Sequence, residues 1–261
     1  MLKYSISGNL SGQLIIFING AGMGPWMWKN QIEYFEDKKC IVFDLPGHGE
    51  NKDIEFISIE NCQEMVSQIV LNESESKEAV VIGHSIGAQI LMSMLEHNQE
   101  IVSRGIIISG LNEQMKFVNF MLKPLVSVSM PLVKLRWFAK IQSNQLSIPN
   151  YMFDDYYNDS IKVSKETLYR VLYENSNFVF ENRSNFTKPV LILVGENEKR
   201  VMKKSARKNL MLLEKGIGYT IKNSAHGIPY ESDSLVNRII ENFINDKSIE
   251  EHKEILEIIK E

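Results

Sequence analysis

The sequence predicts a doubly wound α/β fold with a mostly parallel sheet, interrupted by a helical cap insertion. Short apolar runs alternate with segments of helical length along most of the chain. Strands that helices cover on both faces have such continuous apolar runs. Their alternation with helices is typical of parallel strands joined by right-handed crossovers. The alternation stops between residues 111 and 188, where helical patterns follow one another without a comparable strand pattern.

Five apolar runs predict buried strands, and a sixth strand is expected near the carboxyl end. The runs are 14–18, 40–43, 79–82, 105–108 and 190–194, and the sixth is 218–221. Between them, apolar residues have helical spacing. The expected helices are 28–35, 59–71, 88–97, 203–213 and 235–244.

The interrupted part contains helical patterns at 115–122, 125–141 and 165–173, which Pro124, Pro131 and Pro149 separate. We therefore expect a first core part at 1–110, a cap insertion at 111–188 and a second core part at 189–261. The tail at 246–261 is expected to form an amphipathic helix. A cap at this place lies over the carboxyl edge of the sheet, where α/β proteins bind ligands.

Composition is typical of a globular protein: 261 residues, 44% hydrophobic and 24% charged, with a net charge of −4. This charge gives no reason to expect nucleic acid as a partner. The two cysteines have no metal-ligand spacing, which fits a reducing compartment. The N-terminus lacks a signal-peptide pattern, and prolines and charges break the apolar stretch 118–139. We therefore expect a cytoplasmic protein without stable membrane insertion.

The segment Gly83-His84-Ser85-Ile86-Gly87 lies between a predicted strand and a predicted helix. Gly-x-Ser-x-Gly in this setting is the pattern of a nucleophile elbow, a sharp turn that holds its serine at positive φ with the hydroxyl exposed. A Cβ at either glycine would collide with the tightly folded neighbouring backbone. The bare pattern arises by chance in about one chain of this length in ten, so its setting carries the argument. Ser85 is the candidate nucleophile.

A serine nucleophile needs a general base within hydrogen-bond reach. His226 follows the last predicted strand in a short loop bounded by glycine and proline, and it is the candidate base. The other four histidines are disfavoured because they lie next to the serine, in a tight turn, at a helix end or in the charged tail: His84, His48, His97 and His252.

The third group, an acid that orients the imidazole, is expected after the strand 190–194 if the chain order is serine, acid, histidine. Glu198 is the first choice there and Glu196 the second. Glu113 is a third possibility, because its loop reaches the same edge of the sheet. Each of these glutamates could instead be a solvated loop charge.

Two backbone donors are needed for the oxyanion. The N–H of Ile86, directly after the nucleophile, is expected to be one of them. The other is expected in the glycine-rich loop 19–24, where Ala21 is the candidate. A glycine-rich loop after a strand can also hold phosphate. However, this loop lacks the P-loop pattern, and no acidic ribose partner follows it, so nucleotide binding is disfavoured.

Together these segments resemble the α/β-hydrolase family, in its small cytosolic, cap-bearing branch. The resemblance covers nearly the whole chain and rests on Trp28 and the segments 19–22, 44–49, 83–87, 195–198 and 225–227. It implies a nucleophile, a base, an acid and two oxyanion donors at Ser85, His226, Glu198, Ala21 and Ile86. The chain departs from the family pattern in having Asn19-Gly20 for the usual His-Gly and glutamate for the usual aspartate.

The expected function is a serine hydrolase that cleaves an ester or thioester of a small to medium apolar acyl substrate through an acyl-enzyme, without metal or organic cofactor. The alternatives are a ligand-binding or signalling protein with little turnover, and a C–C bond hydrolase or lyase of the same fold, because fold does not fix the reaction. The oligomeric state stays open.

The cap sequence suggests an apolar acyl-binding cavity, although ordinary core packing explains much of its apolar content. Its large apolar residues are Phe117, Phe120, Met121, Leu122, Leu125, Val126, Met130, Leu132, Val133, Leu135, Trp137 and Phe138. It also carries five basic residues and no acidic one between Met115 and Phe153. These charges are expected on solvated helix faces, with anionic substrates or an anionic membrane surface as the other readings.

Overall fold

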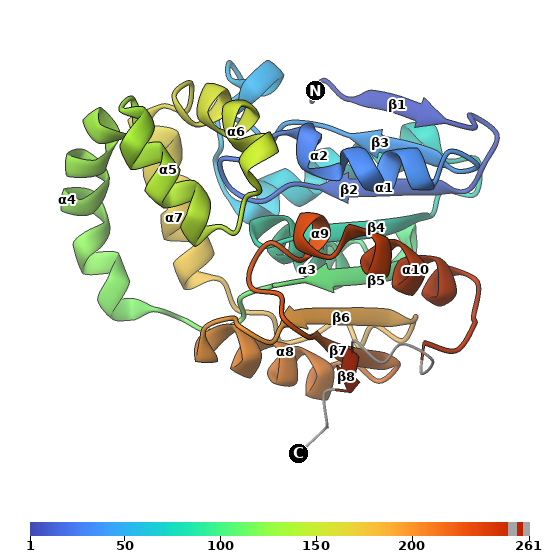
Figure 1. Ribbon diagram of the computed structural model, residues 1–261. Helices are drawn as coiled ribbons and strands as arrows, with labels where there is room; N and C mark the ends of the chain where they lie inside the picture. The colour runs from blue at the N-terminus through green and yellow to red at the C-terminus, as the bar shows by residue number, and fades with distance from the viewer. Residues whose placement is uncertain (250–254, 258–261) are drawn as a thin grey trace.

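The computed structural model describes residues 1–249 and 255–257. Within them, one sheet has the strand order β1-β3-β2-β4-β5-β6-β7-β8 (Figure 1). Strands β1 and β8 pair antiparallel at the two edges, and all other neighbours pair parallel. The strands are β1 (Ser5–Gly8), β2 (Leu14–Ile18), β3 (Lys39–Val42), β4 (Ala79–His84), β5 (Val102–Ile108), β6 (Val190–Gly195), β7 (Gly216–Ile221) and β8 (Ile255–Glu257). The predicted mostly parallel sheet is confirmed.

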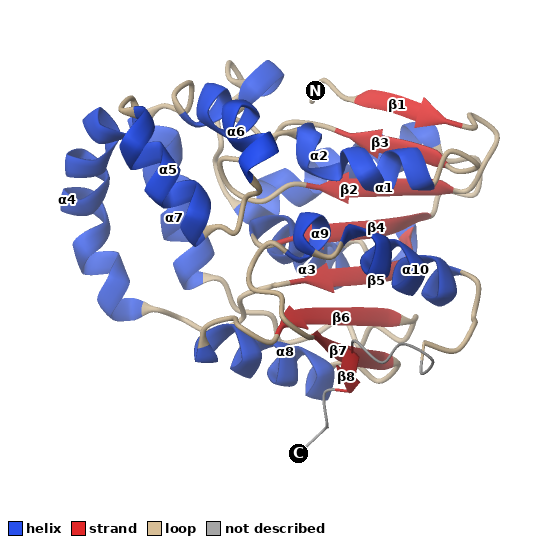
Figure 2. Cartoon of the chain, in the orientation of Figure 1, coloured by secondary structure: helices blue, strands red, loops and turns tan. Residues whose placement is uncertain are grey.

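Helices cover both faces of this sheet (Figure 2). One face packs against α2 (Ile59–Glu73), α3 (Ile86–His97) and α8 (Arg200–Leu212). The other packs against α1 (Lys29–Tyr34), α9 (Ile228–Glu231) and α10 (Asp233–Ile244). Alternate residues of one strand go to opposite sides: Ile16 and Ile18 lie in the first cluster, whereas Ile15 and Phe17 lie in the second. This two-sided burial explains the continuous apolar runs.

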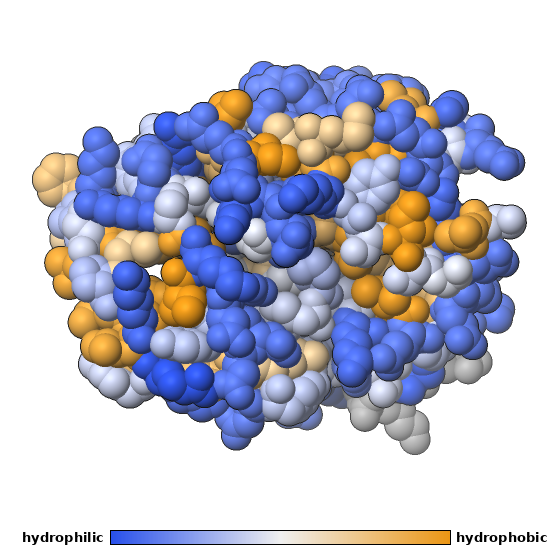
Figure 3. Space-filling view, turned by 90° about the horizontal axis from the view of Figure 1, so that it is seen from above, coloured by the Kyte–Doolittle hydropathy of each residue, from blue (hydrophilic) through white to orange (hydrophobic). Residues whose placement is uncertain are grey.

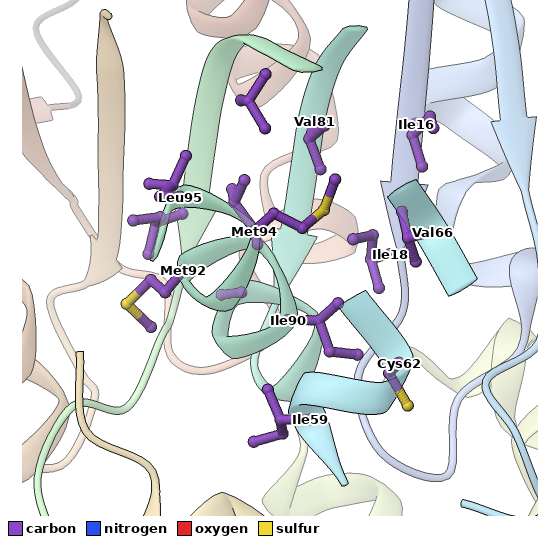
Figure 4. Packing of buried hydrophobic residues seen from close by; sticks show 14 of the residues in the cluster. Ile16, Ile18, Ile59, Cys62, Val66, Val81, Ile90, Met92, Met94 and Leu95 are labelled. Atoms are coloured by element: carbon purple, nitrogen blue, oxygen red, sulfur yellow. The ribbon is translucent and has the colours of Figure 1, made fainter. Parts of the chain in front are cut away.

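The first cluster holds the helix that follows Ser85. Ile90 and Met94 of α3 pack between Val66 of α2 and Val81 of β4 (Figure 4). All four side chains are fully buried. Because α3 is fixed against the sheet and against α2, the turn that joins it to β4 has a fixed position.

The cap, defined here as the helices between β5 and β6, contains α4 (Lys116–Val133), α5 (Arg136–Gln145), α6 (Phe153–Ser160) and α7 (Lys165–Asn177). The predicted boundaries at 111 and 188 fall in the loops beside these strands, and a separate cap domain stays a prediction. The expected helix break at Pro124 is wrong, because α4 runs through both Pro124 and Pro131. Both prolines are exposed, so water can satisfy the carbonyls that lose a partner at each proline.

The expectation of a helix over 246–261 is wrong where the structure describes the tail. Residues Ile255–Glu257 form β8, with Leu256 opposite Thr220 of β7. An edge strand offers unpaired N–H and C=O groups to an extended segment, and Ile255 is β-branched and favours a strand. Residues 250–254 and 258–261 lie outside the described part, so the rest of that prediction is untested.

Two further expectations concern the membrane and the cysteines. No helix within the described residues has the length and apolar content needed to cross a bilayer. Cys40 and Cys62 are both buried and free.

Candidate active site

Ser85 lies at the turn between β4 and α3 with φ 57° and ψ −116°. Its N–H donates a hydrogen bond of 2.9 Å to the carbonyl of Ile108 at the end of β5, and its own carbonyl accepts from Ala88 at 3.1 Å. These bonds hold a non-glycine residue in a left-handed conformation that costs energy. The turn therefore has the backbone of a nucleophile elbow.

The two glycines of the elbow stand where no side chain fits. A Cβ at Gly83 would lie 2.2 Å from the carbonyl oxygen of Gly87, and one at Gly87 would lie 2.3 Å from that of Ile18. Both contacts are with backbone, which cannot move aside without disturbing β2 or α3. The steric reason expected from the sequence therefore holds.

Glu198 and His226 meet at the carboxyl edge of the sheet, after β6 and β7 respectively. The Nδ1–H of His226 donates to Oε2 of Glu198 at 3.3 Å. The carboxylate is almost fully buried, with 1% of its side chain exposed, whereas 24% of the imidazole is exposed. A buried carboxylate on Nδ1 leaves the other ring nitrogen, Nε2, as the acceptor.

The other carboxylate oxygen of Glu198 has partners that the sequence did not reveal. Ser109 donates its hydroxyl to Oε1, and the N–H of Gly195 lies 3.4 Å from the same atom. Ser109 directly follows β5 and has φ 52°, a conformation that few non-glycine residues adopt. Its position one residue beyond a predicted strand was the available signal.

Backbone contacts hold together the acid loop and the base loop, the names used here for the loops that carry the candidate acid Glu198 and the candidate base His226. Asn197 donates to the carbonyl of Ser224 at 2.8 Å, and Glu196 donates to that of Ile221 at 2.9 Å. A Cβ at Gly195 would lie 2.3 Å from the carbonyl oxygen of Ala225. The acid loop and the base loop are thus in direct contact.

The two alternative acids make other contacts. Glu196 accepts the backbone N–H of Asn223 at 2.9 Å. Glu113 pairs with Lys204 on α8, with 3.0 Å between the carboxylate oxygen and Nζ. Of the three candidate glutamates, Glu198 is the one that contacts the imidazole.

His84, the residue before the candidate nucleophile, contacts the loop of the candidate base. Its Nε2–H donates to the carbonyl of His226 at 2.8 Å. Burial, together with a smaller effect of the neighbouring His226, lowers the pKa of His84 to about 3. The ring is therefore neutral near pH 7 and serves as a fixed donor.

The loop after β2 lies beside this arrangement. Asn19 is fully buried and donates to the carbonyl of Phe43 at 2.8 Å and, at 3.4 Å, to that of Met23. An amide thus makes loop hydrogen bonds where the family usually has histidine. A Cβ at Gly20 would lie 3.0 Å from Nδ1 of His84, which places the loop next to the elbow. Ala21 is half-buried against the first cluster.

The second expected oxyanion donor, Ile86, is the first residue of α3. The N–H groups of a helix's first turn have no partner inside the helix. The N–H of Ile86 is therefore available beside Ser85, the candidate nucleophile, where a donor to an oxyanion is expected.

A hydrogen bond from Ser85 Oγ to Nε2 of His226 is absent among the described residues. In unliganded hydrolases this bond is often long and tightens only with substrate. No group of three or more histidine, cysteine, aspartate or glutamate side chains is placed to hold a metal ion in residues 1–249 or 255–257.

Comparison with known proteins agrees with the fold. The sequence matches the description "Alpha/beta hydrolase family" over residues 15–238. The chain belongs to the alpha/beta hydrolase family. That match includes the elbow, the acid loop and the base loop.

Relatives of this hydrolase-family chain are known from several bacteria. It is 24% identical to the uncharacterized hydrolase YugF of Bacillus subtilis over 257 residues, which covers 90% of this chain and 91% of YugF. It is 30% identical over 107 residues to a Haemophilus influenzae protein provisionally named a 2-succinyl-6-hydroxy-2,4-cyclohexadiene-1-carboxylate synthase. That alignment covers 39% of this chain and only 42% of the relative.

A solved structure of similar fold is the enol-lactonase from Burkholderia xenovorans, with a TM-score of 0.79, 14% identity and coverage of 94% of this chain and 96% of that one. Identity at this level shows the fold alone. Taken together, the family match and the named relatives support a general hydrolase function for this alpha/beta hydrolase.

The cap of this hydrolase is anchored on the core near the candidate residues. Trp26, just after the glycine-rich loop, donates from Nε1 to Asp159 of α6 at 2.8 Å. Tyr230 of α9 donates its hydroxyl to the carbonyl of Leu146 at 2.7 Å. The cap thus contacts the core both beside the glycine-rich loop and beside α9, which follows His226.

The large apolar residues of the cap are partly buried, as expected for ordinary core packing, and partly exposed. Leu122, Val126 and Val133 are buried, but Phe120 and Trp137 are 84% and 60% exposed. A hollow of about 410 Å³, lined by residues that include Glu96 and His97, lies at the far end of α3 from Ser85. The predicted acyl-binding cavity stays a prediction.

Proposed function

We propose that this protein is a serine hydrolase that cleaves a carboxylic ester or thioester of an apolar acyl group through an acyl-enzyme. The observation that carries the proposal is the contact of the buried Glu198 carboxylate with Nδ1 of His226. This contact favours the tautomer in which Nε2 can accept a proton. The left-handed turn that presents Ser85 beside the base loop supports the assignment of the nucleophile.

In the proposed first half-reaction, Ser85 Oγ attacks the carbonyl carbon while its proton passes to Nε2 of His226. The oxyanion that forms accepts hydrogen bonds from the N–H groups of Ile86 and Ala21. The carbonyl re-forms, the C–O or C–S bond breaks, and His226 gives the proton to the departing alcohol or thiol. The product is an acyl ester on Ser85.

In the second half-reaction, water gives a proton to His226 and its oxygen attacks the acyl carbon. The bond to Ser85 then breaks, the proton returns to the serine oxygen, and a carboxylic acid leaves. The Glu198 carboxylate stabilises the imidazolium that forms twice in each cycle. Apart from the substrate and this water, these steps use side chains and backbone groups of this chain.

A fluorophosphonate probe tests the nucleophile directly. The wild-type protein is expected to label and to hydrolyse short-chain aryl esters, whereas Ser85→Ala does neither. Ser93→Ala, which changes a buried serine on the same helix, serves as the matched control and is expected to label normally. A wild-type protein that neither labels nor turns over aryl esters would favour a ligand-binding or signalling role.

A C–C bond hydrolase or lyase is the second candidate, because the Haemophilus influenzae relative is provisionally named a 2-succinyl-6-hydroxy-2,4-cyclohexadiene-1-carboxylate synthase and not an esterase. A panel of acyl esters and thioesters of graded length separates the two. Turnover that is highest at one acyl length supports the esterase or thioesterase proposal. Labelling of Ser85 without turnover of any panel member favours the second candidate.

A further inference from the structure

The outer side of the cap carries large apolar side chains that nothing in the described chain covers. We call these residues the cap surface: Phe120, Met121, Leu125, Val128, Leu135, Trp137 and Ile141, all of them exposed. Met121, Leu125 and Val128 have the i, i+4, i+7 spacing of one helix face. Single exposed apolar residues are common on proteins, but a group of them on adjoining helices marks an interaction site.

A second apolar stripe on α4 shows that the cap surface is not the packing face of that helix. Leu122, Val126 and Val133 are buried, and α4 packs against α7 and α5. A surface helix of a globular protein normally has one apolar stripe and a polar opposite side. Helix α4 therefore has apolar residues in excess of what its contacts in this chain need.

Basic side chains accompany the cap surface. The chain has five basic and no acidic residues between Met115 and Phe153, although its net charge is −4. Lys123, Lys134 and Arg136 are exposed; Arg136 pairs with Asp154, whereas Lys123 lies 5.5 Å from the centre of the Tyr169 ring. The partner of this surface must therefore accept both apolar groups and positive charge.

The shape of the region favours a deformable partner. Helix α4 forms one extremity of the molecule (Figure 1). Viewed from above, hydrophobic side chains lie among hydrophilic ones over this part (Figure 3). A second copy of the chain would bring lysines against lysines in a two-fold interface. A lipid interface takes protruding apolar side chains into the acyl boundary while lysines reach the headgroups.

We propose that the cap surface docks this protein peripherally on an anionic lipid bilayer. Phe120, Leu125, Val128 and Trp137 enter the boundary between headgroups and acyl chains. Lys123 and Lys134 contact the anionic headgroups. The helices lie on the membrane and do not cross it, in agreement with the absence of a helix in the described chain that could. The proposal does not depend on the chemistry at Ser85.

Flotation with vesicles measures this binding without any turnover. The full-length protein is mixed with vesicles of phosphatidylcholine alone or of phosphatidylcholine with phosphatidylglycerol. We expect flotation with the mixed vesicles at low salt, and at least several-fold weaker binding with neutral vesicles or at high salt, because surface charge is screened. No flotation with the mixed vesicles at low salt overturns the proposal.

Two pairs of variants locate the surface. Lys123→Glu/Lys134→Glu is expected to lower the partition coefficient by about 25-fold or more, since each lysine near an anionic surface contributes about fivefold. Arg207→Glu, at an exposed position of α8, should leave it nearly unchanged. Phe120→Ser/Val128→Ser should lower it at least tenfold, whereas Met211→Ser, 65% exposed on α8, should not. Equal binding by all variants contradicts the proposal.

Trp137 reports the depth of insertion. Trp28 is fully buried and Trp26 is half-buried, so brominated lipid is expected to quench Trp137 selectively. Trp137→Phe should still float but lose most of this quenching. If the wild type floats but Trp137 is not quenched, another face binds and the proposal fails.

Two further measurements test whether the cap surface instead binds a second copy of the chain or an acidic protein. Sedimentation that reveals a stable dimer, lost in Phe120→Ser/Val128→Ser, would assign the surface to self-association and overturn the proposal. Preferred binding to an acidic protein over the mixed vesicles would overturn it as well. Circular dichroism checks that each variant folds. Because aryl ester turnover is measured separately, loss of vesicle binding leaves the proposed hydrolase function untouched, and the reverse also holds.

Discussion

Ser109 donates its hydroxyl to Oε1 of Glu198, while His226 contacts Oε2 of the same carboxylate. The two oxygens therefore have different partners: Oε1 is held by a residue at the end of β5, and Oε2 contacts the imidazole. Glutamate has one more rotatable bond than the aspartate usual in this family, and so more conformational freedom. A second, fixed partner on Oε1 removes that freedom and sets the plane of the carboxylate.

Ser109→Gly tests this positioning role. Glycine accepts the left-handed backbone of this position without strain, so the change removes the CH2OH side chain and its hydrogen bond without forcing the backbone to move. Hydrogen bonds to charged groups contribute about 1.5–3 kcal/mol, and we expect kcat for aryl esters to fall about tenfold with KM nearly unchanged. The effect should vanish when Glu198→Gln is already present. An equal tenfold loss in both backgrounds would mean that Ser109 acts by another route.

Glu198→Gln is expected to lower kcat by roughly a thousandfold or more, because an amide cannot stabilise the imidazolium and permits the wrong tautomer. Glu196→Gln and Glu113→Gln are the matched controls and should stay within a few-fold of the wild type. Steady-state kinetics on one aryl ester decides between the three. Normal activity of Glu198→Gln would return the choice of acid to the other two.

Gly87→Ala is expected to destabilise the protein by about 3 kcal/mol or more, because the new Cβ would lie 2.3 Å from the carbonyl oxygen of Ile18. Gly105→Ala on β5 is the control, since its Cβ would meet nothing closer than 3.6 Å. Urea unfolding measures both. Similar stability of the two variants would show that the elbow adapts to a methyl group.

His84 makes stability depend on pH in a defined direction. Its pKa is lowered from 6.5 to about 3 in the folded protein, mainly by burial. At a pH between 3 and 6.5, the unfolded chain therefore binds a proton at His84 that the folded chain does not. Stability is therefore lost as pH falls below 6.5, by about 1.4 kcal/mol per pH unit from this residue. His48 acts in the same direction, because burial lowers its pKa as well.

The variant His84→Gln isolates this contribution. Glutamine keeps an N–H donor for the His226 carbonyl but has no proton to gain. Urea unfolding between pH 6 and pH 4 should give a shallower loss of stability for His84→Gln than for the wild type. Parallel curves would mean that His84 is protonated in the folded protein.

The sheet could be predicted because its strands are buried on both faces and therefore leave long apolar runs. The elbow could be predicted because its glycines leave no space for a Cβ, and that constraint is visible as a local pattern. Strand β1 was missed because only one of its four residues, Ile6, is a large apolar one, and an edge strand needs no continuous apolar run. Strand β1 forms by pairing with β3, and a pairing between distant segments leaves no pattern in the sequence of the strand itself.

Of the candidate site, the sequence could predict the residues whose place follows from the order of strands and loops along the chain. Glu198 and His226 follow neighbouring parallel strands, so both reach one edge of the sheet. Ser109 was missed because its role arises from contact with a residue 89 positions away. The exposure of Phe120 and Trp137 was missed for a related reason: an apolar pattern does not tell which of its faces meets another helix.

The bond from His84 to the His226 carbonyl couples the end of β4 to the loop that follows β7, and the cap contributes to neither. Together with the contacts between the acid and base loops, it makes the relative geometry of the three candidate catalytic residues a property of the sheet. The cap connects neighbouring strands β5 and β6 and contributes none of those three residues. If the cap is replaced by the insertion of another family member, substrate preference and membrane attachment should therefore change. The relative positions of Ser85, Glu198 and His226 should stay the same.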